Sequence, residues 1–174
     1  IFTAGFLISS NSVGNPTGSK FFDAVITVFW IVAICNSINF FDNVDGGASG
    51  TVAICSIGLF IIALNGGQFL IAALAVVISG ATFGFLLWNK SPARIYMGDA
   101  GALFLGALLA SLTIRIKPVT NSAGVSFLIP ICLLAVPILD TSVAIITRLA
   151  RGLSPLQGGR DHLSHRLMRL GYTK

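Results

Sequence analysis

Charge of either sign is scarce in this sequence. Only 10% of its 174 residues are charged and glutamate is absent, whereas soluble domains carry about 25% charged residues. Hydrophobic residues make up 55% of the chain and the mean hydropathy is +0.90. This composition excludes an ordinary soluble domain and predicts a polytopic membrane protein. Because acidic residues are so rare, we expect each of them to have a specific role. All six are aspartates: Asp23, Asp42, Asp45, Asp99, Asp140 and Asp161.

Cysteine is also rare, and no CxxC or Cys/His pattern occurs. Cys35, Cys55 and Cys132 lie in apolar runs, where we expect them to behave as small buried hydrophobic residues. The sequence opens at Ile1 with neither a methionine nor a basic segment typical of a signal peptide. We therefore expect a fragment of a longer protein, with residues 1–20 forming an irregular or partial segment.

The apolar runs predict an all-α protein with about five transmembrane helices. A helix needs about 20 apolar residues to cross a bilayer, and polar or Gly-rich turns separate the runs. We expect one membrane-embedded domain over residues 1–174, with a basic tail loop over residues 149–174. The predicted spans are Phe21–Phe41, Ala48–Leu64, Phe69–Trp88, Ala102–Ile114 and Val125–Arg148.

Basic residues predict the orientation of these helices. Alternating crossings place the loops 42–47, 88–101 and 149–174 on one face. That face carries Lys90, Arg94, Arg148, Arg151, Arg160, Arg166, Arg169 and Lys174, and the other carries Lys20, Arg115 and Lys117. Because positive charge marks the cytoplasmic side, we expect a multi-pass membrane protein with its polar loops in the cytoplasm.

Four carboxamide or carboxylate residues follow the first span at a spacing of three: Asn36, Asn39, Asp42 and Asp45. An ideal helix would turn successive members by about 60°, so they converge only if the last turn tightens or the helix ends. Carboxylates are unfavourable at a helix C-terminus unless a cation compensates them. The pattern favours a site for a hard cation at the membrane surface, and the alternative is a solvated loop.

A second polar cluster, Met97-Gly98-Asp99-Ala100-Gly101, precedes the fourth span. Asp99 is a natural N-cap. The same setting, with glycines and helix amides, also suits an anion or metal site. Asp99 together with Asn39 and Asp42 would supply oxygen ligands of the kind that Mg²⁺ prefers.

The tail contains a third cluster, residues 158–166, in which His162 and His165 are three apart and Arg160 and Arg166 flank them. Arginines disfavour a zinc site here and favour a phosphate clamp. The alternative is a surface-bound basic helix over residues 162–170.

Asp140 lies inside the fifth span, where an acid is either functional or bonds backbone loosened near Pro130 or Pro137. A transporter or channel is therefore an alternative class, but it would distribute its acids through the membrane depth. Asp42, Asp45, Asp99 and Asp161 instead gather at one predicted face, which favours an enzyme.

Four motifs then occur in order: NSINFFDNVDGGASG, YMGDAGALFLG, PILDTSVAIITR and GGRDHLSHRL. Together they resemble the polyprenyl-phosphate N-acetylhexosamine-1-phosphate transferases over residues 21–173. This bacterial membrane family includes phospho-N-acetylmuramoyl-pentapeptide transferases and undecaprenyl-phosphate N-acetylglucosamine-1-phosphate transferases. The tail and the PILD segment look more like the N-acetylglucosamine branch.

The resemblance implies transfer of a sugar 1-phosphate, expected to be N-acetylglucosamine 1-phosphate, from a UDP-sugar to undecaprenyl phosphate. UMP is released, and the product starts a lipid-linked cell-envelope glycan. The expected cofactor is Mg²⁺, with Mn²⁺ as an alternative, and no nucleic-acid partner is expected; a homodimer is compatible. By resemblance, the metal ligands are Asn39 and Asp99, the catalytic residues are Asp42, Asp45 and Asp99, and the substrate-binding residues are Asn36, Asp45, Arg160, His162 and His165.

The sequence departs from this family in two ways. The Asp-Asp pair expected upstream of residue 21 is absent, so we expect the fragment alone to be inactive, and a non-catalytic remnant is a further alternative. Ser164 stands where the family commonly has a third histidine. A serine can still donate a hydrogen bond to phosphate.

Overall fold

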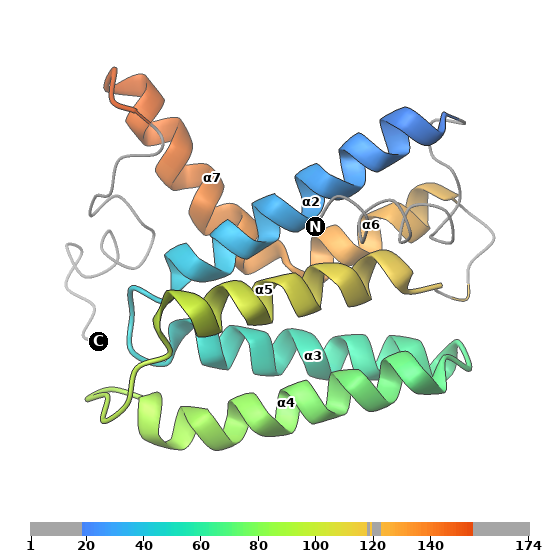
Figure 1. Ribbon diagram of the computed structural model, residues 1–174, viewed down its shortest axis with the longest axis horizontal. Coiled ribbons are helices and arrows are strands. Elements are labelled where there is room, and N and C mark those ends of the chain that lie inside the picture. Colours follow the sequence, from blue (N-terminus) through green and yellow to red (C-terminus); the bar gives the residue numbers. More distant parts are fainter. Residues whose placement is uncertain (1–18, 118, 120–122, 155–174) are drawn as a thin grey trace.

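The computed structural model describes residues 19–117, 119 and 123–154, and their regular structure is entirely helical. Figure 1 shows the helices as a bundle. They are α2 (Lys20–Phe41), α3 (Gly47–Asn65), α4 (Phe69–Asn89), α5 (Gly98–Arg115), α6 (Ala123–Leu133) and α7 (Ala135–Ala150). The predicted irregular segment 1–20 falls outside the described residues except for its last two positions, and so does most of the basic tail.

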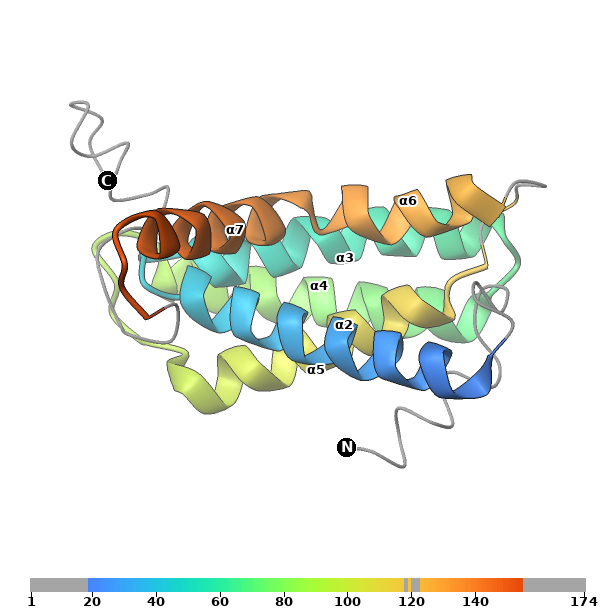
Figure 2. The ribbon, with the colours of Figure 1, turned by 90° about the horizontal axis from the view of Figure 1, so that it is seen from above.

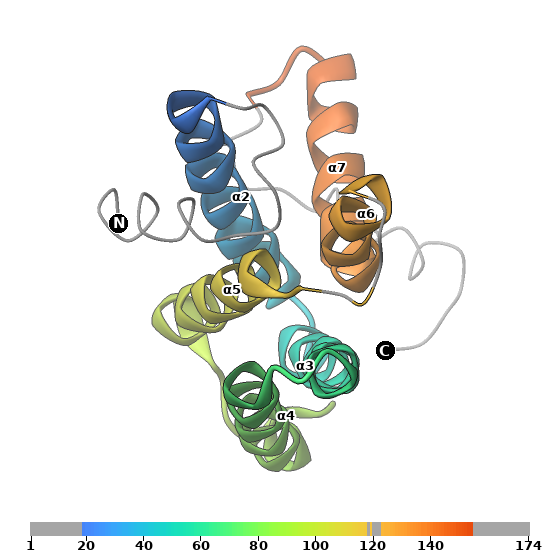
Figure 3. The same ribbon diagram turned by 90° about the vertical axis from the view of Figure 1, so that its right-hand side faces the viewer.

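Two helix pairs build the bundle. α3 and α4 form an antiparallel hairpin, and α5 packs along α2 above it, as Figures 1 and 3 show. The hairpin reverses at Gly67, whose φ of 67° lies in the left-handed region that suits glycine. α7 contacts α2 but diverges from it, so the two helices form a cross in Figure 1.

α2, α3, α4 and α5 are each long and apolar enough to cross a membrane. Their outer faces carry exposed large apolar side chains, among them Phe29, Phe69, Leu70 and Val77. An exposed apolar surface of this extent suits contact with lipid. The all-α polytopic architecture predicted from composition is therefore confirmed.

The limits of two predicted spans were wrong. The fourth helix begins at Gly98 and not at Ala102, so Asp99 lies in its first turn. A carboxylate is favourable there because the helix N-terminus carries partial positive charge. The fifth span is not one continuous helix, because α6 ends at Leu133 and α7 begins at Ala135.

Pro137 explains this interruption. A proline has no amide hydrogen, and its ring clashes with the carbonyl four residues earlier, here that of Leu133. The Leu133 oxygen is contacted instead by Sγ of Cys55 from α3, at 3.0 Å. Helical hydrogen bonding continues on either side, from Leu134 N to Pro130 O and from Ile138 N to Leu134 O, both 3.1 Å. The segment is therefore a kinked helix pair whose kink packs on α3.

The polar loops lie at one end of the bundle, which we call the polar end. It comprises the α2–α3 loop (residues 42–46), the α4–α5 loop (residues 90–97) and residues 151–154 after α7. All three lie on the left in Figures 1 and 2. At the opposite end, the Gln68 side chain donates to Arg115 O at 3.1 Å and accepts from Lys117 N at 2.7 Å. The prediction that these loops share one face is confirmed for the described residues.

Candidate active site

The last turns of α2 meet the first turn of α5 at the polar end. Nδ2 of Asn39 donates to Oδ1 of Asp99 at 3.1 Å. The two helices can approach because position 106 is glycine: a Cβ there would lie 2.7 Å from Cα of Cys35. The pairing of Asn39 with Asp99, which the sequence placed in separate motifs, therefore depends on a small residue two turns further along α5.

Asp42 lies directly beyond α2, as its C-cap residue. Partial burial raises the pKa of its carboxyl group above the ordinary value. A backbone hydrogen bond from Gly98 opposes this change, while the nearby negative charge of Asp99 adds to the increase in pKa. Two carboxylates thus lie close together beside a helix C-terminus, an arrangement that favours a cation between them.

Asp45 occupies a different position, in contact with the α4–α5 loop. Its Oδ2 accepts a hydrogen bond from the backbone N–H of Ala93 at 3.1 Å. The bond draws the α2–α3 loop onto the α4–α5 loop. Asp45 is therefore bonded to the α4–α5 loop, whereas Asn39 is bonded to Asp99 at the start of α5.

Asn89, at the end of α4, is a site residue that the sequence analysis missed. Its side chain is 2% exposed. Its Oδ1 accepts from Ser49 Oγ at 2.8 Å and from Gly46 N at 3.2 Å, and its Nδ2 donates to Ile95 O at 2.9 Å. One carboxamide therefore fastens the start of α3 to the α4–α5 loop. The sequence shows only that Asn89 lies at the border of an apolar run and a polar loop, which does not identify these partners.

The other predicted residues are placed as follows. Asn36 is exposed on α2, and its Nδ2 donates to Val32 O at 2.7 Å within the same helix. Asp140 is 1% exposed and lies in the middle of α7. Asp99 is not an N-cap, because Met97 takes that position and makes no side-chain capping bond. Arg160, His162 and His165 lie outside the described residues.

The chemistry of the donor set fits a hard cation such as Mg²⁺. Asn39, Asp42 and Asp99 offer amide and carboxylate oxygens, the ligands that Mg²⁺ prefers, and the mutual repulsion of the two carboxylates would be relieved by it. In the part of the chain that the structure describes, no group of three His, Cys, Asp or Glu side chains forms a ligand set. A cation here would therefore complete its shell with water or substrate phosphates, as Mg²⁺ commonly does.

Helices of membrane length with acids and amides gathered at one end define a polytopic membrane protein with a polar site at one membrane surface. Residues 1–117 match the family described as Glycosyl transferase family 4. The chain belongs to this family, and the resemblance drawn from its four motifs is confirmed.

Curated relatives agree with this assignment. A Bacillus subtilis (strain 168) protein, described as a probable undecaprenyl-phosphate N-acetylglucosaminyl 1-phosphate transferase, is 43% identical over 150 residues, which are 85% of this chain and 41% of the relative. A decaprenyl-phosphate N-acetylglucosaminephosphotransferase of Mycolicibacterium smegmatis is 33% identical over 184 residues, covering 95% of this chain and 45% of the relative. A phospho-N-acetylmuramoyl-pentapeptide-transferase of Streptococcus agalactiae is 43% identical over 94 residues, 54% of this chain and 28% of the relative. The chain thus spans less than half the length of these relatives.

Proposed function

We propose that this protein transfers N-acetylglucosamine 1-phosphate from UDP-N-acetylglucosamine to undecaprenyl phosphate. The carrying observation is the group formed by Asn39, Asp42 and Asp99 at the polar end. The names of the Bacillus and Mycolicibacterium relatives support both the sugar and the class of lipid acceptor. The product would begin a lipid-linked cell-envelope glycan.

The transfer balances as a phosphoryl substitution. An oxygen of the acceptor phosphate forms a bond to the phosphorus that carries the sugar. The bond from that phosphorus to the oxygen bridging the diphosphate breaks, and UMP leaves with the bridging oxygen. Because both substrates are anionic, the site must neutralise phosphate charge and hold the reacting groups in line.

Mg²⁺, or Mn²⁺ in its place, would be held by Asn39 and Asp99 and would supply charge neutralisation of the diphosphate. Asn39 and Asp99 are already oriented by their mutual hydrogen bond. Asp42, held by the Gly98 amide, contributes the second carboxylate beside the acceptor phosphate. Asn36, Asp45, Arg160, His162 and His165 are proposed to contact the nucleotide or sugar phosphate.

The polar end is proposed to face the cytoplasm of a bacterial inner membrane. Lys90, Arg94 and Arg151 lie on the loops at this end, which agrees with the preference of basic residues for that side. A nucleotide sugar made in the cytoplasm would then reach the site directly. The lipid acceptor would enter sideways from the bilayer, and its phosphate would remain at the membrane surface.

The test uses a chimera in which this chain replaces the matching segment of the Bacillus subtilis relative. Membranes carrying it receive UDP-N-acetylglucosamine and undecaprenyl phosphate, and UMP and lipid-linked sugar are measured with Mg²⁺ or with EDTA. We expect Mg²⁺-dependent product, and an Asp99→Asn chimera should lose at least about 100-fold in rate.

Asp23→Asn is the matched control, because it makes the same chemical change at the far end of α2 and should retain activity when the protein is folded. Absence of product from every UDP-sugar offered to a folded chimera would overturn the proposed reaction. Product that is indifferent to EDTA would overturn the metal site alone.

A further inference from the structure

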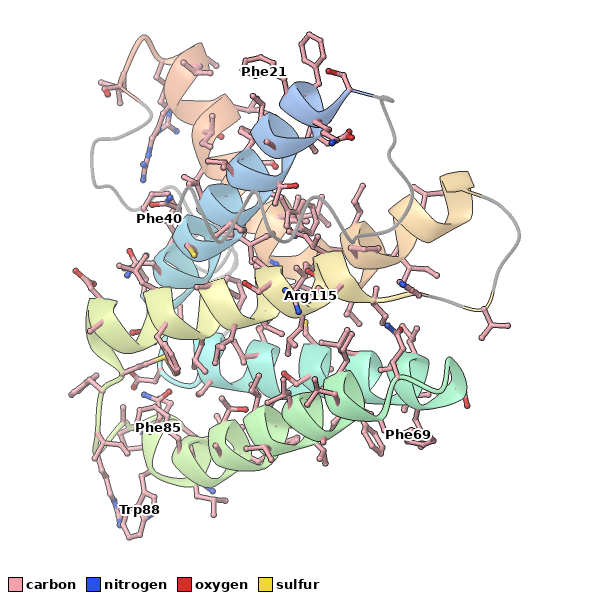
Figure 4. All side chains as sticks on the ribbon, turned by 45° about the vertical axis from the view of Figure 1, so that its right-hand side comes forward. Phe21, Phe40, Phe69, Phe85, Trp88 and Arg115 are labelled. Carbon is pink, nitrogen blue, oxygen red and sulfur yellow. The ribbon has the colours of Figure 1, made fainter. Side chains whose placement is uncertain are left out.

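A cavity at the C-terminal end of α4 is separate from the group formed by Asn39, Asp42 and Asp99. Leu87, Trp88, Lys90, Ser91, Pro92 and Arg94 line a cavity of about 350 Å³. That volume lies within the range of about 300–1,000 Å³ typical of small-molecule sites. Figure 4 shows Trp88 at the end of α4, directed away from the other helices. None of the residues that line the cavity belongs to the group formed by Asn39, Asp42 and Asp99.

The lining is apolar on one side and cationic on the other. Leu87 and Trp88 are 67% and 54% exposed and belong to the last turn of a helix long enough to span a membrane. Lys90 and Arg94 are also exposed and follow directly in the loop. Tryptophan gathers at the membrane–water boundary, so the two cations stand at the depth of lipid head groups.

The loop holds these groups in place. Arg94 N donates to Trp88 O at 2.8 Å, which closes residues 88–94 into a turn. The guanidinium carbon of Arg94 lies 5.7 Å from the centroid of the Trp88 ring, a cation–π distance. Arg94 is therefore oriented before any ligand binds. A guanidinium held in a fixed orientation binds a phosphate more tightly than a mobile one does, because less conformational entropy is lost on binding.

We propose that this cavity binds the head group of an anionic phospholipid of the surrounding leaflet. The phosphate would lie between Lys90 and Arg94, Ser91 would donate a hydrogen bond to it, and the acyl chain would follow Leu87 and Trp88. Charge complementarity favours an anionic lipid over a zwitterionic one. The amphipathic lining favours a lipid over free phosphate, because free phosphate would leave Leu87 and the Trp88 ring in water.

This site lies on the loop that positions the candidate active site. Ala93, between two lining residues, donates its N–H to Asp45. Asn89, next to Trp88, bonds Gly46 and Ile95. Head-group binding would therefore stabilise the segment on which Asp45 depends, while touching neither Asp42 nor Asp99.

The test uses Trp88 as the reporter. The protein with Trp30→Phe, which leaves Trp88 as its only tryptophan, is reconstituted into bilayers that contain either brominated phosphatidylglycerol or brominated phosphatidylcholine. Bromine quenches tryptophan fluorescence at contact. We expect stronger quenching by the anionic lipid at equal mole fraction, and a selectivity that falls about fivefold for each cation removed by Lys90→Ala or Arg94→Ala.

The matched control is the pair Lys20→Ala and Lys117→Ala, which removes two positive charges at the opposite end of the bundle. These variants should keep the full selectivity at Trp88. Equal quenching by the two lipids would overturn the proposal, as would loss of selectivity in the control pair.

Inorganic phosphate at millimolar concentration should not reduce the quenching; if it does, the site binds phosphate and not a lipid. If Trp30→Phe does not fold, the unaltered protein gives the same comparison over a constant background from Trp30.

Discussion

Nδ2 of Asn39 lies 3.1 Å from Oδ1 of Asp99, so a hydrogen bond joins residues that are 60 positions apart in the chain. The bond uses the donor group of the amide, which leaves the amide oxygen of Asn39 available for the proposed cation. The same bond fixes the orientation of the Asp99 carboxylate at the start of α5. Two motifs that are separate in the sequence therefore form one oxygen-rich group.

Replacing Asn39 tests this group directly. Asn39→Leu removes both the bond to Asp99 and the amide oxygen, so sugar-phosphate transfer by the chimera should fall about 100-fold. The free energy of unfolding should change by only about 1 kcal/mol, because the lost bond is exposed. Asn65→Leu, at the opposite end of the bundle, is the control and should leave the rate unchanged. A rate retained in the Asn39 variant would exclude this residue from the site.

Asp42 links function to stability through its raised pKa. A group whose pKa is higher in the folded state than in the unfolded state destabilises the fold when it is ionised. The cost is complete above the folded pKa, decreases as the pH falls through it, and is absent below the ordinary value of 3.8. Asp42→Asn should therefore raise the melting temperature at pH 7 and lose this advantage below pH 3.8.

The measurement is thermal unfolding in detergent without divalent cations, repeated across this pH range. Asparagine keeps an oxygen for the Gly98 amide, so the substitution isolates the charge. Transfer activity of the chimera should fall in the same variant, because the second carboxylate is lost. An unchanged or lower melting temperature at pH 7 would contradict the assigned cause of the raised pKa.

Asn89 is expected to act as a positioning residue. Asn89→Ala leaves the Gly46 amide and the Ile95 carbonyl without their buried partner, which should lower the free energy of unfolding by about 2–4 kcal/mol. Ser79→Ala is the control, because Ser79 Oγ bonds Ala53 O at 3.1 Å between the same two helices. The Ser79 variant should lose stability without losing activity, measured at a temperature where both variants are folded. If the Asn89 and Ser79 variants lost similar activity, Asn89 would contribute to stability alone and not to positioning the site.

Gly106 gives a test of the α2–α5 contact. A Cβ at this position would lie 2.7 Å from Cα of Cys35, a backbone atom that cannot yield alone. Gly106→Ala should therefore separate the helices, cost about 1–3 kcal/mol in stability and weaken the Asn39–Asp99 pair. Gly80→Ala has open space around it and should stabilise α4 by up to about 1 kcal/mol. Thermal unfolding of the two variants should move in opposite directions.

Much of this architecture could be predicted because membrane-spanning helices are recognisable in the sequence as long apolar runs. The runs ending near Phe41, Leu64 and Trp88 were located to within a residue or two, since a bilayer requires unbroken apolar length. The two motifs also led us to expect Asn39 and Asp99 near each other as metal ligands; the structure joins them by a hydrogen bond, and the metal itself stays a prediction. The kink at Leu134 could not be predicted, although Pro130 and Pro137 were visible, because apolar length alone does not distinguish a straight span from an interrupted one.

The role of Asn89 could not be predicted for a related reason. A carboxamide at the end of an apolar run usually marks the exit of a helix into water. Here Ser49 from α3 and Gly46 from the α2–α3 loop bond the side chain, a relationship that exists only after α3 packs on α4. The pattern of one segment carries no information about such partners.

The carboxamide of Asn89 also limits how the two loops of the site can vary. A residue inserted between Asn89 and Ile95 would move an acceptor that the same side chain must reach while it holds Gly46. The α2–α3 and α4–α5 loops are therefore coupled through Asn89. An insertion or deletion in one loop would require a compensating change in the other.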